Sequence, residues 1–150
     1  MKRTIIRIVS LALVLILLLS TIVYAAETSS AYISITSAYI IRSGDNVTVY
    51  FYIVGKNIMD EIGAKKILLY ERIPNSHAWS LVEVFDSDDS QYTSALLSTN
   101  ASAKSSSVTY TDGSAANDYF AVVRFYAEKD GGSDTIPQNT PTSYGTGSTP

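Results

Sequence analysis

The sequence has no cysteine and a single histidine among its 150 residues. Without cysteine, the chain can form no disulfide bond and carry no lipid anchor on a thiol. A structural zinc site needs three or four His, Cys or carboxylate ligands, so this composition nearly excludes one. Glycine-rich phosphate loops and dinucleotide fingerprints are also absent. The protein must therefore be held together by packing alone, and we expect no cofactor.

Catalytic motifs are equally scarce. His77 lies in a turn beside Trp79, and a Ser-His-Asp triad could recruit Ser76 or Ser80. Neither serine sits in a Gly-x-Ser-x-Gly motif, and no pair of acids has a spacing that marks a hydrolytic site. We therefore predict that the protein is not an enzyme, with a small secreted hydrolase as the third alternative.

The N-terminus has the layout of an export signal. Three basic residues precede an apolar run over residues 8–19, and small residues follow at Ala25 and Ala26. The uninterrupted apolar core, residues 11–19, has nine residues, whereas a membrane-spanning helix needs about 20. We predict a helical signal peptide over residues 1–25, cleaved after Ala25, and a secreted protein. An uncleaved N-terminal membrane anchor is the alternative.

Cleavage makes the chain more acidic. Losing Lys2, Arg3 and Arg7 leaves eight of eleven basic residues against fourteen acidic ones, a net charge of −6. Such a surface repels nucleic acid and anionic lipid, so no nucleic-acid partner is expected, and membrane contact only through an uncleaved signal. We expect a short linker over 26–30, one domain over 31–142 and a disordered tail over 143–150.

Apolar residues in the mature chain recur with a period of two, which predicts strands. The clearest are residues 47–54, where Val47, Val49, Phe51 and Ile53 share one face, and residues 118–128. Further strands are expected over 31–42, 65–71, 78–85 and 107–111, a weaker one over 92–97, and an edge strand with Pro137 over 135–143. Residues 55–63 are expected to form helical turns and residues 100–106 a loop. The pattern is that of an all-β, antiparallel two-sheet sandwich of about seven to eight strands.

Two resemblances accompany this pattern. Residues 119–127, Tyr-Phe-Ala-Val-Val-Arg-Phe-Tyr-Ala, with the following Gly131-Gly132-Ser133, resemble the sixth strand and turn of fibronectin type III and related immunoglobulin-like domains. The resemblance implies an immunoglobulin-like sandwich in which the hydroxyl of Tyr119 ties the corner at the start of this strand. Trp79 departs from it, because it follows the third strand. Gly55, Met59 and residues 62–64 resemble a group of uncharacterised small secreted bacterial proteins. Neither resemblance transfers an activity.

Aromatic residues on the outer faces are candidates for ligand binding. Tyr50 and Tyr52 face away from the expected core on one sheet, and Phe120 and Tyr126 do so on the other, beside Arg124. Third and sixth strands are usually neighbours in such sandwiches, so the favoured binding surface comprises Tyr70, Phe120, Arg124 and Tyr126.

An acidic loop is the one candidate metal site. Asp86, Asp88 and Asp89 could offer hard oxygen ligands to Ca²⁺, although the loop lacks the glycine and distal glutamate of an EF-hand. A solvated acidic turn explains the same residues.

These features together predict a secreted, non-catalytic β-sandwich module that binds an extracellular protein or glycan. The alternative is a structural subunit that associates with itself through an edge strand.

Overall fold

The computed structural model describes residues 30–146, and this part of the chain is mostly antiparallel β-structure. The strands are β1 (Ile33–Ser43), β2 (Asn46–Arg72), β3 (Ser80–Asp86), β4 (Leu97–Tyr110), β5 (Asp118–Lys129) and β6 (Gly132–Asn139), with one short helix, α2 (Thr93–Leu96). No helix within residues 30–146 is long and apolar enough to cross a bilayer. The predicted signal peptide over 1–25 lies outside the described residues, as does most of the predicted linker.

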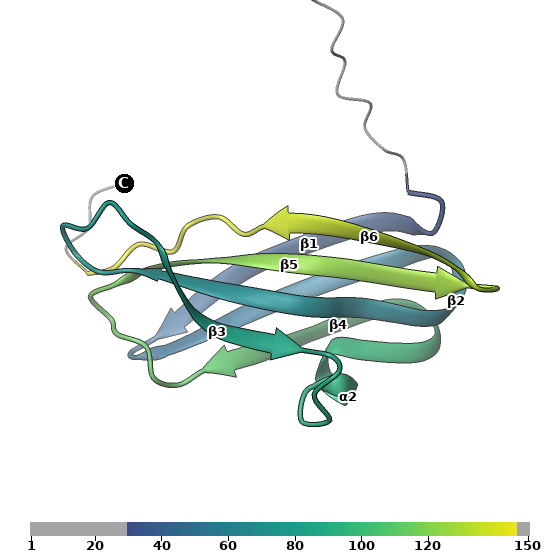
Figure 1. Ribbon diagram of the computed structural model, residues 1–150, viewed down its shortest axis with the longest axis horizontal. Helices are drawn as coiled ribbons and strands as arrows, with labels where there is room; N and C mark the ends of the chain where they lie inside the picture. Colours follow the sequence, from purple (N-terminus) through teal and green to yellow (C-terminus); the bar gives the residue numbers. More distant parts are fainter. Residues whose placement is uncertain (1–29, 147–150) are drawn as a thin grey trace, which may run out of the picture.

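Strand β2 is the central strand of one curled sheet, because its 27 residues pair with four other strands, β1, β3, β4 and β5. Its first part pairs with β1 and β4, and its second part pairs with β3 and β5, which in turn pairs with β6. Figure 1 shows β1 and β4 behind β5 and β6, with β2 running through both layers. We call β1, β4 and residues 46–55 of β2 the first half. The second half comprises β3, β5, β6 and residues 61–72 of β2.

The bend in β2 has a local cause. The register with β4 shifts between Val54 and Met59, and the register with β5 shifts between Ala64 and Lys66. Such bulges bend a strand and increase its twist. Gly63 allows α2 to end against this bend, because a Cβ atom there would lie 2.0 Å from the carbonyl oxygen of Leu96.

The core lies between the two halves. Val47, Val49, Phe51 and Ile53 are buried on the first half and face the buried row of β5, as the period of two predicts. Phe51 and Phe125 meet edge to face across this interior, with ring centroids 6.3 Å apart. The all-β expectation and both strong strands are confirmed. Because β2 merges two expected strands into one and residues 93–96 are helical, residues 30–146 contain six strands instead of seven or eight.

Residues 55–63 are not helical, contrary to the expectation from their apolar spacing. They continue β2, with Met59 and Ile62 buried and Ile58 exposed. Residues 59–63 pair with β4 and residues 61–64 with β5, so the ladder satisfies backbone groups that an isolated helical turn would leave open.

Two further local expectations are wrong. Residues 92–97 contain α2 instead of a weak strand, and residues 100–106 belong to β4 instead of a loop. The Ser and Ala residues of β4 have little intrinsic strand preference. They are extended because the first part of β2 supplies a partner for them.

Hydrogen bonds from several parts of the chain hold the start of β5. The buried hydroxyl of Tyr119 accepts the backbone N–H of Ser114 at 2.8 Å and donates to Glu71 at 2.5 Å. Residues 143–146, the described part of the expected disordered tail, lie against this strand. Residues 147–150 of that tail lie outside the described residues. Ser143 exchanges backbone hydrogen bonds with Tyr119, and the N–H of Gly145 donates to Asp118 at 2.7 Å.

Candidate binding surfaces

The outer face of the second half carries an aromatic cluster. Tyr70 and Phe120 are opposite each other on β2 and β5, and their rings stack with centroids 4.9 Å apart. Trp79 meets Phe120 edge-on at 4.7 Å, and the Arg72 guanidinium lies 4.8 Å from the centre of the Trp79 ring. The structure thus brings Tyr70 and Phe120 together as predicted. It adds Trp79 and Arg72, whose proximity depends on the turn between β2 and β3.

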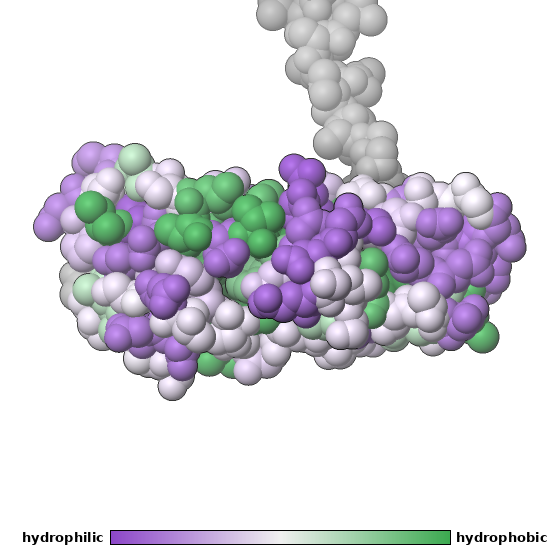
Figure 2. Space-filling model, turned by 60° about the horizontal axis from the view of Figure 1, so that its bottom comes forward, coloured by the Kyte–Doolittle hydropathy of each residue, from purple (hydrophilic) through white to green (hydrophobic). Residues whose placement is uncertain are grey.

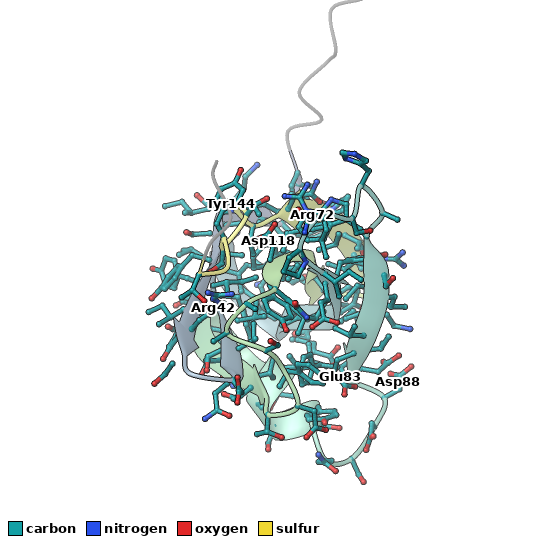
Figure 3. The ribbon with its side chains drawn as sticks, turned by 90° about the vertical axis from the view of Figure 1, so that its left-hand side faces the viewer. Arg42, Arg72, Glu83, Asp88, Asp118 and Tyr144 are labelled. Atoms are coloured by element: carbon teal, nitrogen blue, oxygen red, sulfur yellow. The ribbon has the colours of Figure 1, made fainter. Side chains whose placement is uncertain are left out.

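An ion pair holds one side of the aromatic cluster. Both Nε and Nη2 of Arg72 donate to the same carboxylate oxygen of Asp118, at 3.1 and 2.7 Å. The Asp118 side chain is only 4% exposed, and its other oxygen accepts the N–H of Gly145. Figure 3 shows Arg72 and Asp118 next to each other near the end of the molecule where Tyr144 lies. The rings and charges of the cluster are therefore engaged mainly with one another.

Arg124 and Tyr126 do not belong to this cluster. Tyr126 is six residues beyond Phe120 on β5, about 20 Å along an extended strand. The Lys65 ammonium lies 4.7 Å from the centre of the Tyr126 ring, and the hydroxyl donates to Glu128. Burial, with the hydrogen bond to Glu128, raises the pKa of Tyr126 to about 12. The four predicted residues thus share the outer face of the second half, but only Tyr70 and Phe120 are in ring contact.

Two further ion pairs lie on this outer face. Lys66 contacts Asp86 at 2.6 Å and Lys65 contacts Glu61 at 2.9 Å. In Figure 2, hydrophobic side chains gather over β3, where Leu81 is exposed, and hydrophilic side chains lie beside them. The second half therefore presents a mixed surface.

The outer face of the first half is different, because the outward side chains aligned across residues 35–41, 48–54 and 103–109 include no charge. The register places outward side chains in four cross-strand rows of three, which we call the uncharged face. The rows are Ile41, Thr48 and Thr109; Tyr39, Tyr50 and Ser107; Ser37, Tyr52 and Ser105; and Ile35, Val54 and Ala103. From the first row to the fourth the face is about 20 Å long, and its width from β1 to β4 is about 10 Å.

Rings and hydroxyls of the uncharged face are open to solvent. Tyr39 is 48% exposed and Tyr52 is 41% exposed, whereas Tyr70, Trp79 and Phe120 of the aromatic cluster are half-buried. Tyr39 stacks on Tyr50 with centroids 5.2 Å apart, which orders both rings. The hydroxyls of Thr48 and Thr109 are hydrogen bonded at 2.9 Å. This face thus combines exposed aromatic surface with hydroxyl groups.

Sequence reasoning placed Tyr50 and Tyr52 outward but missed the contribution of β1. A period of two would place Ile33 and Ile35 on one face, but a register shift between them separates the two. Ile33 is buried, while Ile35 is exposed on the uncharged face. The sequence pattern does not reveal such a bulge. It therefore could not predict that Tyr39 and Ile41 lie on the outer face.

The three candidate calcium ligands do not converge. Asp86 is bound to Lys66 through one oxygen and accepts the N–H of Asp88 through the other, and Asp89 accepts the N–H of Gln91. The hydrogen bond from Lys66 holds the pKa of Asp86 below its usual range. Asp88 projects outward in Figure 3. No group of three His, Cys, Asp or Glu suited to a metal ion occurs in residues 30–146, so the calcium hypothesis has no geometric support.

His77 is exposed on the connection from β2 to β3. An open depression lies elsewhere, beside α2, and is lined by Glu61, Ser90, Thr93, Ser94 and residues 97–99. The hydrolase alternative required a pocket containing His77 beside a carboxylate, and this depression does not include it.

Comparisons with known proteins assign no family. No protein-family model matches the chain, and no curated protein matches it. Among solved structures, it is similar to Spo0M, a sporulation control protein from Bacillus subtilis, with a TM-score of 0.40 and 9% identity. The match covers 70% of this chain and 47% of that one.

Proposed function

We propose that this protein is a secreted, non-catalytic module that binds a neutral glycan on the uncharged face. One observation carries the proposal: twelve outward side chains of β1, β2 and β4 include no charge, yet offer two tyrosine rings that are more than 40% exposed. Apolar area of this kind on a sheet face is typical of an interaction site.

The chemistry of the face suits a sugar polymer. A pyranose ring presents C–H groups that stack on an aromatic ring, and hydroxyls that exchange hydrogen bonds with Tyr, Ser and Thr. A neutral glycan brings no charge that would need a counter-charge on desolvation. The hydroxyls of Ser105, Ser107 and Thr109 lie in the same rows as Tyr52, Tyr50 and Thr48, so both kinds of contact are available along one chain.

The face is also rigid. Its side chains stand on three paired strands, and the stack of Tyr39 on Tyr50 orders two rings before a ligand arrives. A preordered surface loses little conformational entropy on binding. Protein interfaces use Trp and Arg anchors beside Tyr, and here Trp79 and Arg72 contact each other within the aromatic cluster.

The proposal includes secretion of the protein and an immunoglobulin-like fold. The predicted signal peptide would bring the mature chain to the extracellular space, where glycans are abundant, and an immunoglobulin-like relationship is part of the same hypothesis. The structural-subunit alternative concerns an edge of the sheet instead of its face.

A pull-down with polysaccharides tests the proposal. The mature chain from Ala26 is incubated with two insoluble neutral polysaccharides, cellulose and a β-1,3-glucan, and with anionic polygalacturonate. We expect retention on a neutral polymer and none on the anionic one. Tyr39→Ala and Tyr52→Ala should each raise the apparent Kd about tenfold, the effect of losing about 1.4 kcal/mol, and so lower the retained fraction.

The matched control is Tyr144→Ala, since Tyr144 is 42% exposed and lies outside the four rows. This variant should bind like the unmodified protein. Equal retention of all three variants, or loss of binding in the control alone, would contradict the proposal. Binding only to polygalacturonate would contradict it as well.

A further inference from the structure

Three of the four edges of the sheet carry features that oppose the addition of another strand. Strand β6 contains Pro137, which has no N–H to donate. Strand β3 has seven residues, a register shift and the carboxylates of Glu83 and Asp86. Strand β1 is bulged after Ile33. Proline, short length, charge and bulges are the usual means by which proteins protect their edges.

The outer edge of β4 has none of these features over residues 103–110. Its register with β2 is continuous from Val47 opposite Tyr110 to Val54 opposite Ala103. Strand β2 is its sole strand partner within residues 30–146. Lys104 is the one charged residue in this stretch, and its ammonium turns back to the carbonyl oxygen of Ser94 at 2.9 Å. Alternate backbone N–H and C=O groups along eight residues thus face outward as an unpaired ladder.

We propose that this edge pairs antiparallel with the same edge of a second copy, forming a two-fold dimer. A two-fold contact uses identical groups from both copies, so every donor on one edge meets an acceptor on the other. Residues opposite each other in an antiparallel pair share a face, and this requirement restricts the axis to a position on one residue. With the axis at Ser106, Ser105 faces Ser107 and Lys104 faces Val108 of the second copy.

Charge favours a second copy at this edge. The mature chain is acidic, with a net charge of −6, so most surfaces of two copies repel each other. Along β4 no like charges meet in the register above, because Ser, Thr, Ala and Val make up most of the stretch. Cross-strand pairs of Ser and Thr are themselves favourable. The edge is thus a place where two copies can approach without electrostatic cost.

The dimer would also extend the proposed function. A two-fold axis perpendicular to the sheet places both uncharged faces on the same side, as one continuous surface of six strands. Two glycan sites in a row raise the apparent affinity for a polymer through effective concentration. This consequence rests on the glycan proposal, whereas the strand pairing itself does not.

Light scattering coupled to size-exclusion chromatography, in the absence of any glycan, tests the pairing with the mature chain. We expect a mass that rises from monomer to dimer with protein concentration. In this register Ser107 is diagonal to Ser107 of the second copy, about 7 to 8 Å away. Ser107→Lys and Ser107→Glu therefore each place like charges diagonally across the two β4 strands, and each should raise the dimer Kd about tenfold. An equimolar mixture of the two variants should restore the dimer, because the opposite charges then meet.

Ser37→Lys is the matched control, since Ser37 is an exposed residue of the same outer face on the opposite edge strand β1. It should leave the dimer unchanged, and circular dichroism should confirm that all three variants fold. A monomer at every concentration would overturn the proposal, as would a dimer insensitive to Ser107→Lys or one dissociated by Ser37→Lys. Because no glycan is present, these outcomes are independent of the polysaccharide pull-down.

Discussion

The two outer faces of the curled sheet use aromatic residues in different ways. On the second half, Tyr70 stacks on Phe120, Trp79 contacts Phe120 and Arg72, and Arg72 binds Asp118. On the first half, Tyr39 and Tyr52 keep a large part of each ring in solvent, and no charge lies near them in the four rows. Contacts within a face contribute to stability, whereas exposed groups are available to a ligand. Substitutions on the two faces should therefore separate stability from binding.

The largest difference in stability is expected for Arg72→Ala. This change removes the ion pair and both Arg72 hydrogen bonds to the Asp118 carboxylate, which is only 4% exposed, and removing one member of a buried pair costs about 3 kcal/mol. Urea unfolding measures the loss. The counterpart on the first half is Tyr52→Ala, which should cost less than about 0.5 kcal/mol. Equal losses for the two variants would remove the distinction between the faces.

The next effect is a loss of stability at alkaline pH through Tyr119. Burial, with the hydrogen bond to Glu71, raises the pKa of Tyr119 to about 12. Because the folded pKa lies above the unfolded value of about 10, this stabilisation is complete below pH 10 and is lost as the pH rises toward 12. The full loss is on the order of 2 kcal/mol.

Tyr119→Phe should remove that part of the pH dependence. Urea unfolding of both proteins between pH 9 and 12, an interval set by these two pKa values, provides the comparison. The variant should be less stable at neutral pH by about 1 kcal/mol, because the hydroxyl loses its hydrogen bonds. Parallel curves for the two proteins over this interval would contradict the assignment.

A smaller effect is expected for Trp79→Ala. The variant loses the edge-on contact with Phe120 and the contact with Arg72, which together contribute about 1 to 2 kcal/mol. Thermal unfolding should show this decrease, while retention on a neutral polysaccharide stays unchanged. A loss of retention comparable to that of Tyr39→Ala would move the binding surface to the second half.

The smallest effects on stability should come from Arg124→Ala, because the residue is exposed on β5. We expect a change within about 0.5 kcal/mol by urea unfolding, and no change in the pull-down. A large decrease in polysaccharide retention would restore the surface first predicted from the sequence.

The strands with a strict period of two could be predicted because one face of each is buried. Residues 47–54 and 118–128 alternate without interruption, and both form strands with the expected inward row. The strand character of residues 55–63 and 100–106 could not be predicted, since it depends on partners far away in the chain. The expected strand order predicted that Tyr70 and Phe120 lie together. The contact of Trp79 with Phe120 could not be predicted, because it depends on the conformation of the turn between β2 and β3.

The amino-acid sequence alone determined the faces of residues 47–54 and 118–128, the acidic charge and the absence of cysteine chemistry, because each follows from residue type and local period. Only the tertiary structure decided which outer face stays open. The bulge in β1 turned Ile35 outward, and the register of β2 with its neighbours aligned the uncharged rows. On the other face, Tyr70 and Phe120 stack on each other and expose less of their rings. Register and bulges arise from long-range pairing between strands, and a local pattern carries no record of them.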